Sequence, residues 1–315
     1  MSTGAVQVVR PGLLTTVQDL GRWGHQSSGV AVAGPMDTFS HRMANALVGN
    51  AADAATLEIT LIGPELEFDA PTMIAVCGAE FDVTCNGQAI AGSTSAAVPR
   101  GGRVQFGRRR AGARAYLAVA QGFKTPLLLG SRATHVVSAM GGVHGRALIA
   151  GDRLLIAAAP PEHIGRRGVG MAVPNGRARL RVIPGPQADW FTPEAMRTLT
   201  SVGFRVSPRS NRMGYRLEGP PLQRARLEEP ISEPVAFGAI QVPAAGEPIL
   251  LMADRQTAGG YPKIAAVIAA DLPIAGQLAP GDVIEFAACT RQEAAAALIA
   301  RERPLLRVSS DDQRA

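Results

Sequence analysis

The chain has 315 residues, a length that favours about two domains of roughly 150 residues each. Hydrophobic residues make up 46% of the chain and charged residues only 18%, below the roughly 25% of an average globular chain, so a disordered chain is excluded. The net charge of +6 could point to nucleic acid, but the basic residues cluster only at 108–110 and 166–167, without aromatic residues between them. We therefore expect no nucleic-acid partner.

No apolar run approaches the roughly 18 residues of a membrane-spanning helix, and residues 1–11 lack the basic and apolar regions of a signal peptide. We expect a cytoplasmic protein with no membrane partner. The cysteines, Cys77, Cys85 and Cys289, are odd in number and lack metal-ligand spacing. This pattern favours buried reduced thiols over zinc or redox roles, and no metal site is predicted.

Short apolar runs separated by turns predict strands, in chain order, at 5–9, 57–61, 73–76, 115–119, 179–183, 247–253 and 264–268. The predicted helices run from Asp37 or Thr38 to near Gly49, from Thr192 to before Gly203, and over 292–300 behind a Thr290–Glu293 capping box. Strands at such close spacing favour a barrel or sandwich over alternating strands and helices. The sequence therefore predicts a mainly β fold with a few short helices.

The two halves of the chain resemble each other loosely. Residues 61–66 resemble 217–222, and residues 149–156 resemble 278–286, where a Gly-Asp turn precedes a final strand in both cases. We infer two related β-barrel subdomains, although such turns also repeat by chance. The expected limits are 1–160 for the first subdomain, 161–178 for a linker rich in Pro, Gly and Arg, 179–300 for the second subdomain and 301–315 for a tail.

Several catalytic motifs are missing from the sequence. It has no phosphate loop of the Gly-x-x-x-x-Gly-Lys type, no Rossmann glycine fingerprint, no His-Glu-x-x-His and no Gly-x-Ser-x-Gly. This argues against a self-sufficient ATPase, dehydrogenase, zinc protease or serine hydrolase. All five histidines precede residue 164, and surface or structural roles are favoured for each of them.

A polar loop at 254–263 separates the predicted strands at 247–253 and 264–268. It offers the donors and acceptors of Gln256, Thr257, Tyr261 and Lys263, and its paired glycines, Gly259 and Gly260, allow close approach of a ligand or a positive φ. Lys263 is one of only two lysines in an arginine-rich chain, and a lysine can lose its proton when buried. The alternative is a tight connection between strands.

Three further clusters are candidates for a site. Asp19 and Arg22 could bind an anion or pair with each other in a loop. Asp37 could line a site or simply cap a helix. In the polar segment 210–216, which precedes a strand and whose turn holds Ser210, Asn211 and Arg212, the Arg212 guanidinium could bind a carboxylate and the asparagine an amide or ureido group.

Taken together, the motifs resemble those of the carboxyltransferase-domain family, which includes the C subunit of 5-oxoprolinase, allophanate hydrolase subunit 2, a kinase-inhibitor antagonist and the carboxyltransferase region of urea carboxylase. The segments that carry the resemblance are 16–22, 34–37, 45–50, 141–146, 210–214 and 256–262. The resemblance covers about residues 4–300 and leaves out the tail.

The resemblance implies two cyclophilin-like β-barrel subdomains and an active site completed by two partners, one kinase-inhibitor-like (the B subunit) and one lactam-utilisation-like (the A subunit). The implied activity is ATP-dependent opening of 5-oxoproline to L-glutamate by the assembled complex, in which this chain is the C subunit, inactive alone. One alternative is a biotin-dependent carboxyltransferase that acts on urea or a related amide. Another is a non-catalytic protein that binds a kinase inhibitor.

Family position and residue chemistry together suggest roles for the candidate residues. Arg212 would hold a carboxylate or phosphate, and Tyr261 and Lys263 would assist proton transfer. Asn211 and Gln256 would orient the amide, and the backbone of 259–260 would stabilise oxyanion charge. The remaining expected substrate-binding residues are Ser210, Thr257, Asp19, Arg22 and Asp37.

Overall fold

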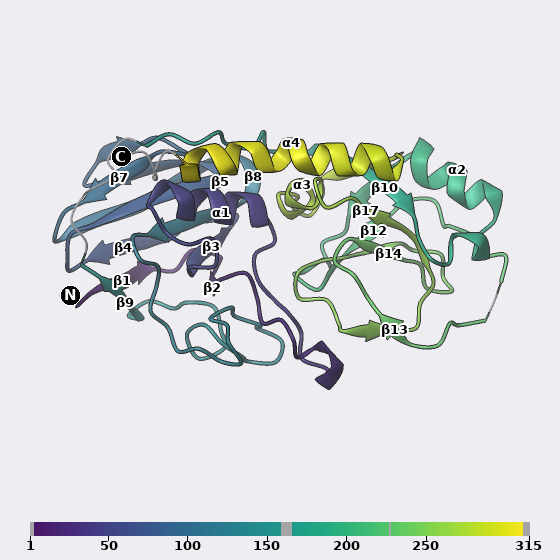
Figure 1. Cartoon of the computed structure of the whole chain (residues 1–315), viewed down its shortest axis with the longest axis horizontal. Helices are drawn as coiled ribbons and strands as arrows, with labels where there is room; N and C mark the ends of the chain where they lie inside the picture. The colour runs from purple at the N-terminus through teal and green to yellow at the C-terminus, as the bar shows by residue number, and fades with distance from the viewer. Residues whose placement is uncertain (1–2, 159–165, 227, 311–315) are drawn as a thin grey trace. The chain divides into compact units, whose positions relative to one another are not determined.

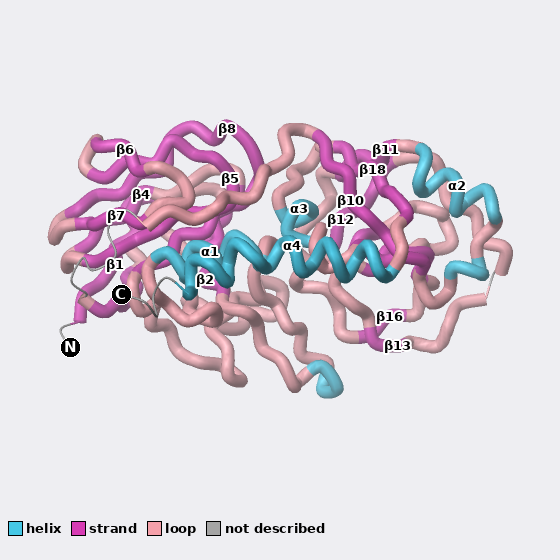
Figure 2. Tube along the Cα trace, turned by 45° about the horizontal axis from the view of Figure 1, so that its top comes forward, coloured by secondary structure: helices cyan, strands magenta, loops and turns pink. Residues whose placement is uncertain are grey.

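A computed structural model describes residues 3–158, 166–226 and 228–310 of a chain whose regular secondary structure is mainly strands (Figure 2). The chain divides into two compact units. Unit one comprises Met1–Trp23, Ala33–Val173 and Glu302–Ala315, and unit two comprises Gly24–Val32 and Pro174–Arg301. The main division lies within the expected linker at 161–178, of which 161–165 fall outside the described residues, as do 311–315 of the expected tail. The domain limits stay a prediction.

Unit one contains a nine-stranded sheet in which β5 and β8 form the longest pair (Figure 1). Its strands are β1 Thr3–Arg10, β2 Leu14–Gln18, β3 Thr56–Thr60, β4 Glu65–Phe68, β5 Thr72–Cys85, β6 Gln88–Ile90, β7 Ser95–Val98, β8 Gly102–Val119 and β9 Arg153–Ala157. The main order is β2-β3-β8-β4-β1-β9, and β5 pairs with β6, β7 and β8. The register of β5 against β8 shifts three times between Gly78 and Val83, and such bulges increase the bend and twist of a strand pair.

Both faces of this sheet are buried where β5 and β8 pair. Along β8, Leu117 and Val119 belong to one apolar core, while Tyr116 and Ala118 belong to another that includes helix α1 (Thr38–Leu47). Successive side chains of a strand point to opposite faces, so a strand covered on both sides is apolar throughout. This explains the uninterrupted apolar run predicted at 115–119.

Unit two is a closed barrel of seven strands (Figure 1). In spatial order they are β10 Arg177–Pro184, β17 Lys263–Val267, β14 Ala239–Gln241, β15 Ile249–Leu251, β12 Gly214–Glu218, β11 Gly203–Val206 and β18 Val283–Ala288. The parallel pair of β10 and β18 closes the ring, whereas the neighbouring pairs are antiparallel. The short strands β13 (Glu233–Pro234) and β16 (Ala258–Gly259) pair separately. The prediction of a mainly β chain with a few short helices is confirmed. The second half closes into a barrel, and the sheet of the first half has open ends at β2 and β9.

The predicted helices are present, and one is longer than expected. Asp37 caps α1 by accepting from the Ser40 N–H, and Thr192 caps α2 (Pro193–Ser201). The last helix, α4, runs over Arg291–Ser310 instead of ending at 300, with Pro304 inside it. Its continuation is stabilised by burial of Leu305 in the α1 core. The short helices α3 (Leu272–Gly276), η1 (Gln26–Ser28) and η2 (Ala188–Trp190) were not predicted.

The repeated Gly-Asp turns at 151–152 and 281–282 have the same hydrogen bonds. In each turn the glycine φ is near +90°, and the aspartate side chain accepts from the backbone N–H three residues earlier, at 2.8 and 2.9 Å. Each turn also exchanges two backbone hydrogen bonds with a strand residue, Val8 in unit one and Val206 in unit two. The predicted turn before a final strand, β9 or β18, is therefore confirmed in both halves.

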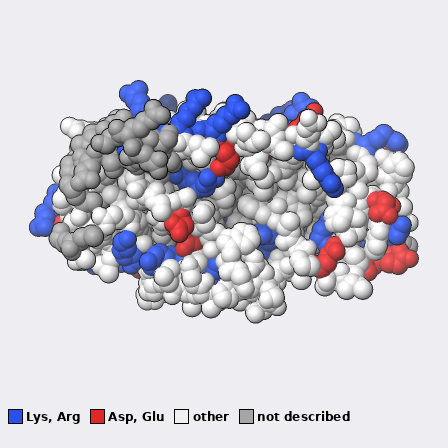
Figure 3. Space-filling model, viewed as in Figure 1, with Lys and Arg blue, Asp and Glu red and all other residues white. Residues whose placement is uncertain are grey.

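The structure also bears on membrane-spanning helices, surface charge, metal ligands and the cysteines. Within the part of the chain that the structure describes, no helix is long and apolar enough to cross a membrane. Basic side chains are spread over the visible face with acidic ones between them, and they form no single patch there (Figure 3). No group of three potential metal ligands occurs in residues 3–158, 166–226 and 228–310. All three cysteines are free, and burial raises the pKa of Cys77 to about 12, which keeps that thiol protonated.

Candidate functional site

A small cavity of about 220 Å³ lies on the outside of the unit-two barrel, over β12, β15 and β14. It is lined by Arg209, Asn211, Met213, Gly214, Arg216, Gln241, Ile249, Leu251, Gln256 and Tyr261. Pockets for drug-sized ligands are larger, at roughly 300–1,000 Å³. The cavity therefore suits a small molecule that is partly polar.

The floor of this cavity follows from strand register. Arg216 of β12 lies opposite Ile249 of β15, and Ile249 lies opposite Gln241 of β14. Their neighbours Tyr215, Leu250 and Ile240 are buried. Because directly paired residues point to the same face of a sheet, Arg216, Ile249 and Gln241 form one row across the outer face.

The predicted polar loop at 254–263 forms one wall of the cavity. Gln256 Nε2 donates to Gln241 Oε1 at 3.2 Å, and Gln241 Nε2 donates to the Tyr261 carbonyl at 3.5 Å. Gly259 has no positive φ, but a Cβ there would lie 2.9 Å from Gln241 Nε2 and 3.1 Å from Gln256 Nε2. Gly259 therefore allows close approach and not a positive φ, and the groups that approach it are the two glutamine amides.

The same wall contains Thr257 and Gly260, which do not line the cavity. The Thr257 carbonyl accepts from the Val235 N–H at 3.2 Å. A Cβ on Gly260 would lie 3.2 Å from the Pro230 carbonyl oxygen and 3.4 Å from Ser232 Oγ, and its φ is not positive. Both residues thus contact the segment around β13.

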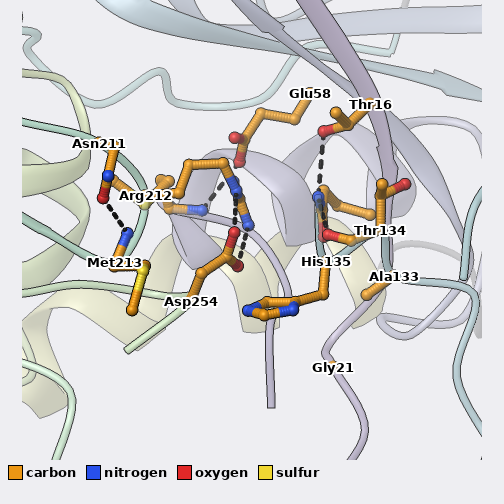
Figure 4. A network of polar contacts seen from close by, with 12 residues as sticks. Thr16, Gly21, Glu58, Ala133, Thr134, His135, Asn211, Arg212, Met213 and Asp254 are labelled. Atoms are coloured by element: carbon orange, nitrogen blue, oxygen red, sulfur yellow. Dashed lines mark hydrogen bonds and ion pairs between the residues drawn. The ribbon is translucent and has the colours of Figure 1, made fainter. Parts of the chain in front are cut away.

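The predicted turn at 210–212 forms the opposite wall. Asn211 Oδ1 accepts from the Met213 N–H at 2.8 Å, and Ser210 Oγ accepts from the Arg216 N–H at 3.1 Å. Arg212 is 6% exposed, and its Nε and Nη2 each donate to Asp254 at 2.9 Å, as Figure 4 shows. Arg212 therefore directs its planar fork at a carboxylate of this chain and does not line the cavity.

Lys263 lies opposite Gln241 in the pairing of β14 with β17 but is also absent from the lining. Its Nζ donates to Glu233 Oε1 at 2.7 Å, and Gln187 Nε2 donates to the same oxygen at 2.8 Å. The hydrogen bond from Lys263, followed by that from Gln187, lowers the pKa of Glu233. This carboxylate is therefore negative at neutral pH and forms an ion pair with Lys263.

The expected residues of unit one have structural partners. Asp19 accepts from Ser131 Oγ at 2.6 Å and from the Gly21 N–H at 2.9 Å. Arg22 is fully buried, and its Nη2 donates to the Ala133 carbonyl at 2.6 Å. Both residues thus hold the loop around 131–133.

Asp37 is fully buried and caps α1, as the structural alternative held. Its backbone N–H donates to Tyr116 Oη at 2.8 Å, and that hydroxyl donates to Glu58 at 2.7 Å. Glu58 also accepts from the Met36 N–H at 2.9 Å and lies 3.8 Å from Arg114. These contacts orient the turn at 34–37.

Sequence reasoning assigned no role to the polar cavity residues Arg209, Arg216 and Gln241, although Arg216 ends the candidate segment 210–216. Gln241 interrupts an apolar run at 239–242, and a polar residue in such a run is a detectable signal because burying it requires hydrogen-bond partners. Arg216 carries no local signal that separates it from Arg212 within the segment 210–216. Its place in the row depends on β12 pairing with β15, about 35 residues along the chain.

Comparisons with known proteins agree on one family. The family model described as carboxyltransferase domain, subdomain A and B, matches residues 28–288. The chain is 38% identical over 289 residues to the 5-oxoprolinase C subunit of Escherichia coli (strain K12), covering 92% of this chain and 93% of that protein. It is 36% identical over 280 residues to the protein of the same name in Haemophilus influenzae, covering 89% and 90%.

Among solved structures, the urea amidolyase of K. lactis superposes with a TM-score of 0.87 at 33% identity. That match covers 96% of this chain but only 20% of the amidolyase chain. The resemblance inferred from the motifs is thus confirmed. The chain belongs to the carboxyltransferase-domain family.

Proposed function

We propose that this chain is the C subunit of an ATP-dependent 5-oxoprolinase that opens 5-oxoproline to L-glutamate. The observation that carries the proposal is the near full-length likeness to proteins that bear this subunit's name, over 92% of this chain and 93% of the Escherichia coli protein. The proposal includes a cytoplasmic complex with a kinase-inhibitor-like B subunit plus a lactam-utilisation-like A subunit, in which this chain is inactive alone.

The unit-two cavity supports a lactam substrate. It combines the amides of Asn211, Gln241 and Gln256 with the apolar Ile249 and Leu251, so that a small ring with one planar amide meets both its polar and its apolar requirements. At about 220 Å³ the cavity is too small for a nucleotide beside the lactam. We therefore place 5-oxoproline there and leave ATP to a site outside this cavity.

Ring opening then has a definite balance. ATP transfers a phosphoryl group to the lactam oxygen, and water attacks the activated carbonyl carbon. The carbon–nitrogen bond breaks as the nitrogen takes a proton, which leaves an acyl phosphate, with ADP already released by the phosphoryl transfer. A second water then hydrolyses the acyl phosphate to the carboxylate of glutamate and phosphate. Hydrogen bonds from Gln256 and Asn211 would orient the amide during these steps, and the Tyr261 side chain, which is 44% exposed at the cavity, would assist proton transfer.

The test is production of glutamate from 5-oxoproline and ATP by the complex purified after co-expression of all three subunits. We expect turnover that requires all of them, and we expect Gln256→Ala to reduce it more than the same change at Gln223, an exposed glutamine outside the cavity. An assembled complex that consumes no ATP and forms no glutamate would overturn the proposal.

A second candidate is a biotin-dependent carboxyltransferase acting on urea or a related amide. The likeness to urea amidolyase, with a TM-score of 0.87, favours it. Urea also presents a planar amide to the same glutamine side chains. Transfer of a carboxyl group from carboxybiotin to urea by the complex, without glutamate formation, would support this candidate over the first.

A further inference from the structure

We propose that Arg216, with Arg209 beside it, is the carboxylate-binding group of the unit-two cavity and makes the site selective for amides that carry a carboxylate. The inference rests on the proposed function, because 5-oxoproline has a carboxylate next to its lactam ring and urea has none. It assigns substrate selectivity to strand β12 instead of to the turn at 210–212.

Arg212, the buried arginine of the preceding turn, is already paired within the chain. Two of its donors are engaged with Asp254 at 2.9 Å, and the side chains of the pair are 6% and 2% exposed. To bind a substrate carboxylate with this fork, Arg212 would have to leave Asp254, which would then be a buried charge without this partner. Arg212 is therefore a support for the site.

Arg216 is in the opposite situation. It projects from the outer face of β12 and lines the cavity. Among the residues that the structure describes, no hydrogen bond or ion pair engages its guanidinium; only its backbone groups bond to Ser207 and Ser210. A guanidinium has a planar pair of N–H donors that can bind a carboxylate in a bidentate arrangement, so Arg216 can bind the carboxylate of a ligand.

Arg209 can add a second positive charge at the same edge. It pairs with Glu247 at 3.8 Å, and both side chains are more than 60% exposed. Ion pairs of this kind are weak because water screens both charges. Arg209 can therefore turn from Glu247 toward a bound carboxylate at little cost.

The spacing of the row fits a ligand with a carboxylate at one end and an amide at the other. Arg216 and Gln241 are two strands apart, with β15 between them, which places their backbones roughly 10 Å from each other. With the carboxylate at Arg216 and the amide at Gln256, which is bonded to Gln241, a small ring fits over Ile249 between them. The Gln256 amide donates to Gln241, and its own Oε1 is then oriented to accept from a lactam N–H.

The experiment compares 5-oxoproline with 2-pyrrolidinone, the same lactam ring without the carboxylate. Binding of each compound to the full chain is followed by ligand-observed NMR, and the Michaelis constant for the carboxylated lactam is measured with the assembled complex. The variants are Arg216→Leu, Arg216→Lys and Arg209→Leu. The matched control is Arg205→Leu, which removes an outward-facing arginine from the neighbouring strand β11, outside the cavity lining.

We expect Arg216→Leu to weaken binding of 5-oxoproline and raise its Michaelis constant by about 10- to 100-fold, equivalent to about 1.4–2.8 kcal/mol. Binding of 2-pyrrolidinone should change less than about twofold. Arg216→Lys should recover part of the loss, Arg209→Leu should show a smaller one, and Arg205→Leu should match the wild type. Unchanged melting temperatures would show that the variants fold.

Two results would overturn the inference: wild-type chain that binds 5-oxoproline no more tightly than 2-pyrrolidinone, or an Arg216→Leu effect of equal size on both compounds. Failure of the proposed function is distinguishable from these. A wild-type complex that forms no glutamate refutes the oxoprolinase assignment, while the binding comparison still decides whether Arg216 selects a carboxylate.

Discussion

Replacing Asp254 by asparagine should destabilise unit two strongly. The change keeps the size of the side chain but removes the negative charge that faces Arg212. The pair is bidentate, with both distances at 2.9 Å, and its side chains are 6% and 2% exposed, so water cannot replace the lost carboxylate. Removing one partner of a buried ion pair costs about 3–5 kcal/mol. At roughly 4 °C per kcal/mol for a unit of this size, the melting temperature of unit two should fall by about 12–20 °C.

The assay needs a signal from unit two alone, because a protein of two units does not have to unfold in one step. The chain has two tryptophans, Trp23 in unit one and Trp190 in unit two. A Trp23→Phe background therefore leaves Trp190 as the fluorescent reporter. Arg216→Met serves as control, since it removes an exposed arginine nearby and should change stability by less than about 0.5 kcal/mol.

The pair should also affect binding, but without selectivity. Backbone hydrogen bonds of 2.9 Å join Met252 to Met213 and Asp254 to Arg212, so that the two walls of the cavity are held together at this pair. Loosening them should weaken binding of 5-oxoproline and of 2-pyrrolidinone alike. Two results would contradict a supporting role for Arg212. One is unchanged stability in Asp254→Asn. The other is an Arg212→Met variant that keeps full stability and loses only 5-oxoproline binding, because Arg212 would then be a substrate ligand.

Three further outcomes are expected. Burial lowers the pKa of His41 to about 4, whereas the pKa of an unfolded histidine is about 6.5, so the folded state binds fewer protons than the unfolded state below neutral pH. Denaturant unfolding should therefore show about 2 kcal/mol less stability at pH 5 than at pH 8. The variant His41→Gln should remove this difference. Gly259→Ala should raise the Michaelis constant of the complex about tenfold, because its Cβ would displace the amides 2.9 and 3.1 Å away, whereas Gly92→Ala, with open space around it, should not. Asp37→Ala should lower stability by about 0.5–2 kcal/mol through loss of the α1 cap and leave the Michaelis constant unchanged; a large rise in that constant without loss of stability would instead place Asp37 in the site.

Local patterns predicted the elements of this fold well because their causes are local. The caps Asp37 and Thr192 act within one turn of their helices, and the apolar run at 115–119 reflects a strand buried on both faces. The local pattern did not predict where α4 ends. The helix continues through Pro304 because Leu305 is buried in a core whose other residues are distant in sequence. Closure of the barrel by the parallel pair of β10 and β18 is likewise a long-range event that no local signal encodes.

The candidate site likewise has features that a local pattern predicts and others that depend on long-range pairing. The loop at 254–263 and the turn at 210–212 were recognisable as polar segments, and both do border the cavity through Gln256, Tyr261 and Asn211. Which side chains face a ligand depends on pairings that the chain makes only when folded. Arg212 is buried against Asp254, 42 residues away, while Arg216 is left on the outside by the alternation of β12.

Under the proposed function, this division would allow one scaffold to serve amide substrates with and without a carboxylate. The Arg212–Asp254 pair and the close packing at Gly259 hold the two walls and the glutamine amides in place, and an amide ligand of any kind needs that arrangement. Arg216 projects from the outer surface of a strand whose inward-facing neighbours, Tyr215 and Leu217, fill the barrel. A substitution at position 216 therefore leaves the core intact and alters the charge offered to the ligand. On our proposal for Arg216, selectivity for a carboxylate would change at this position without a change in fold.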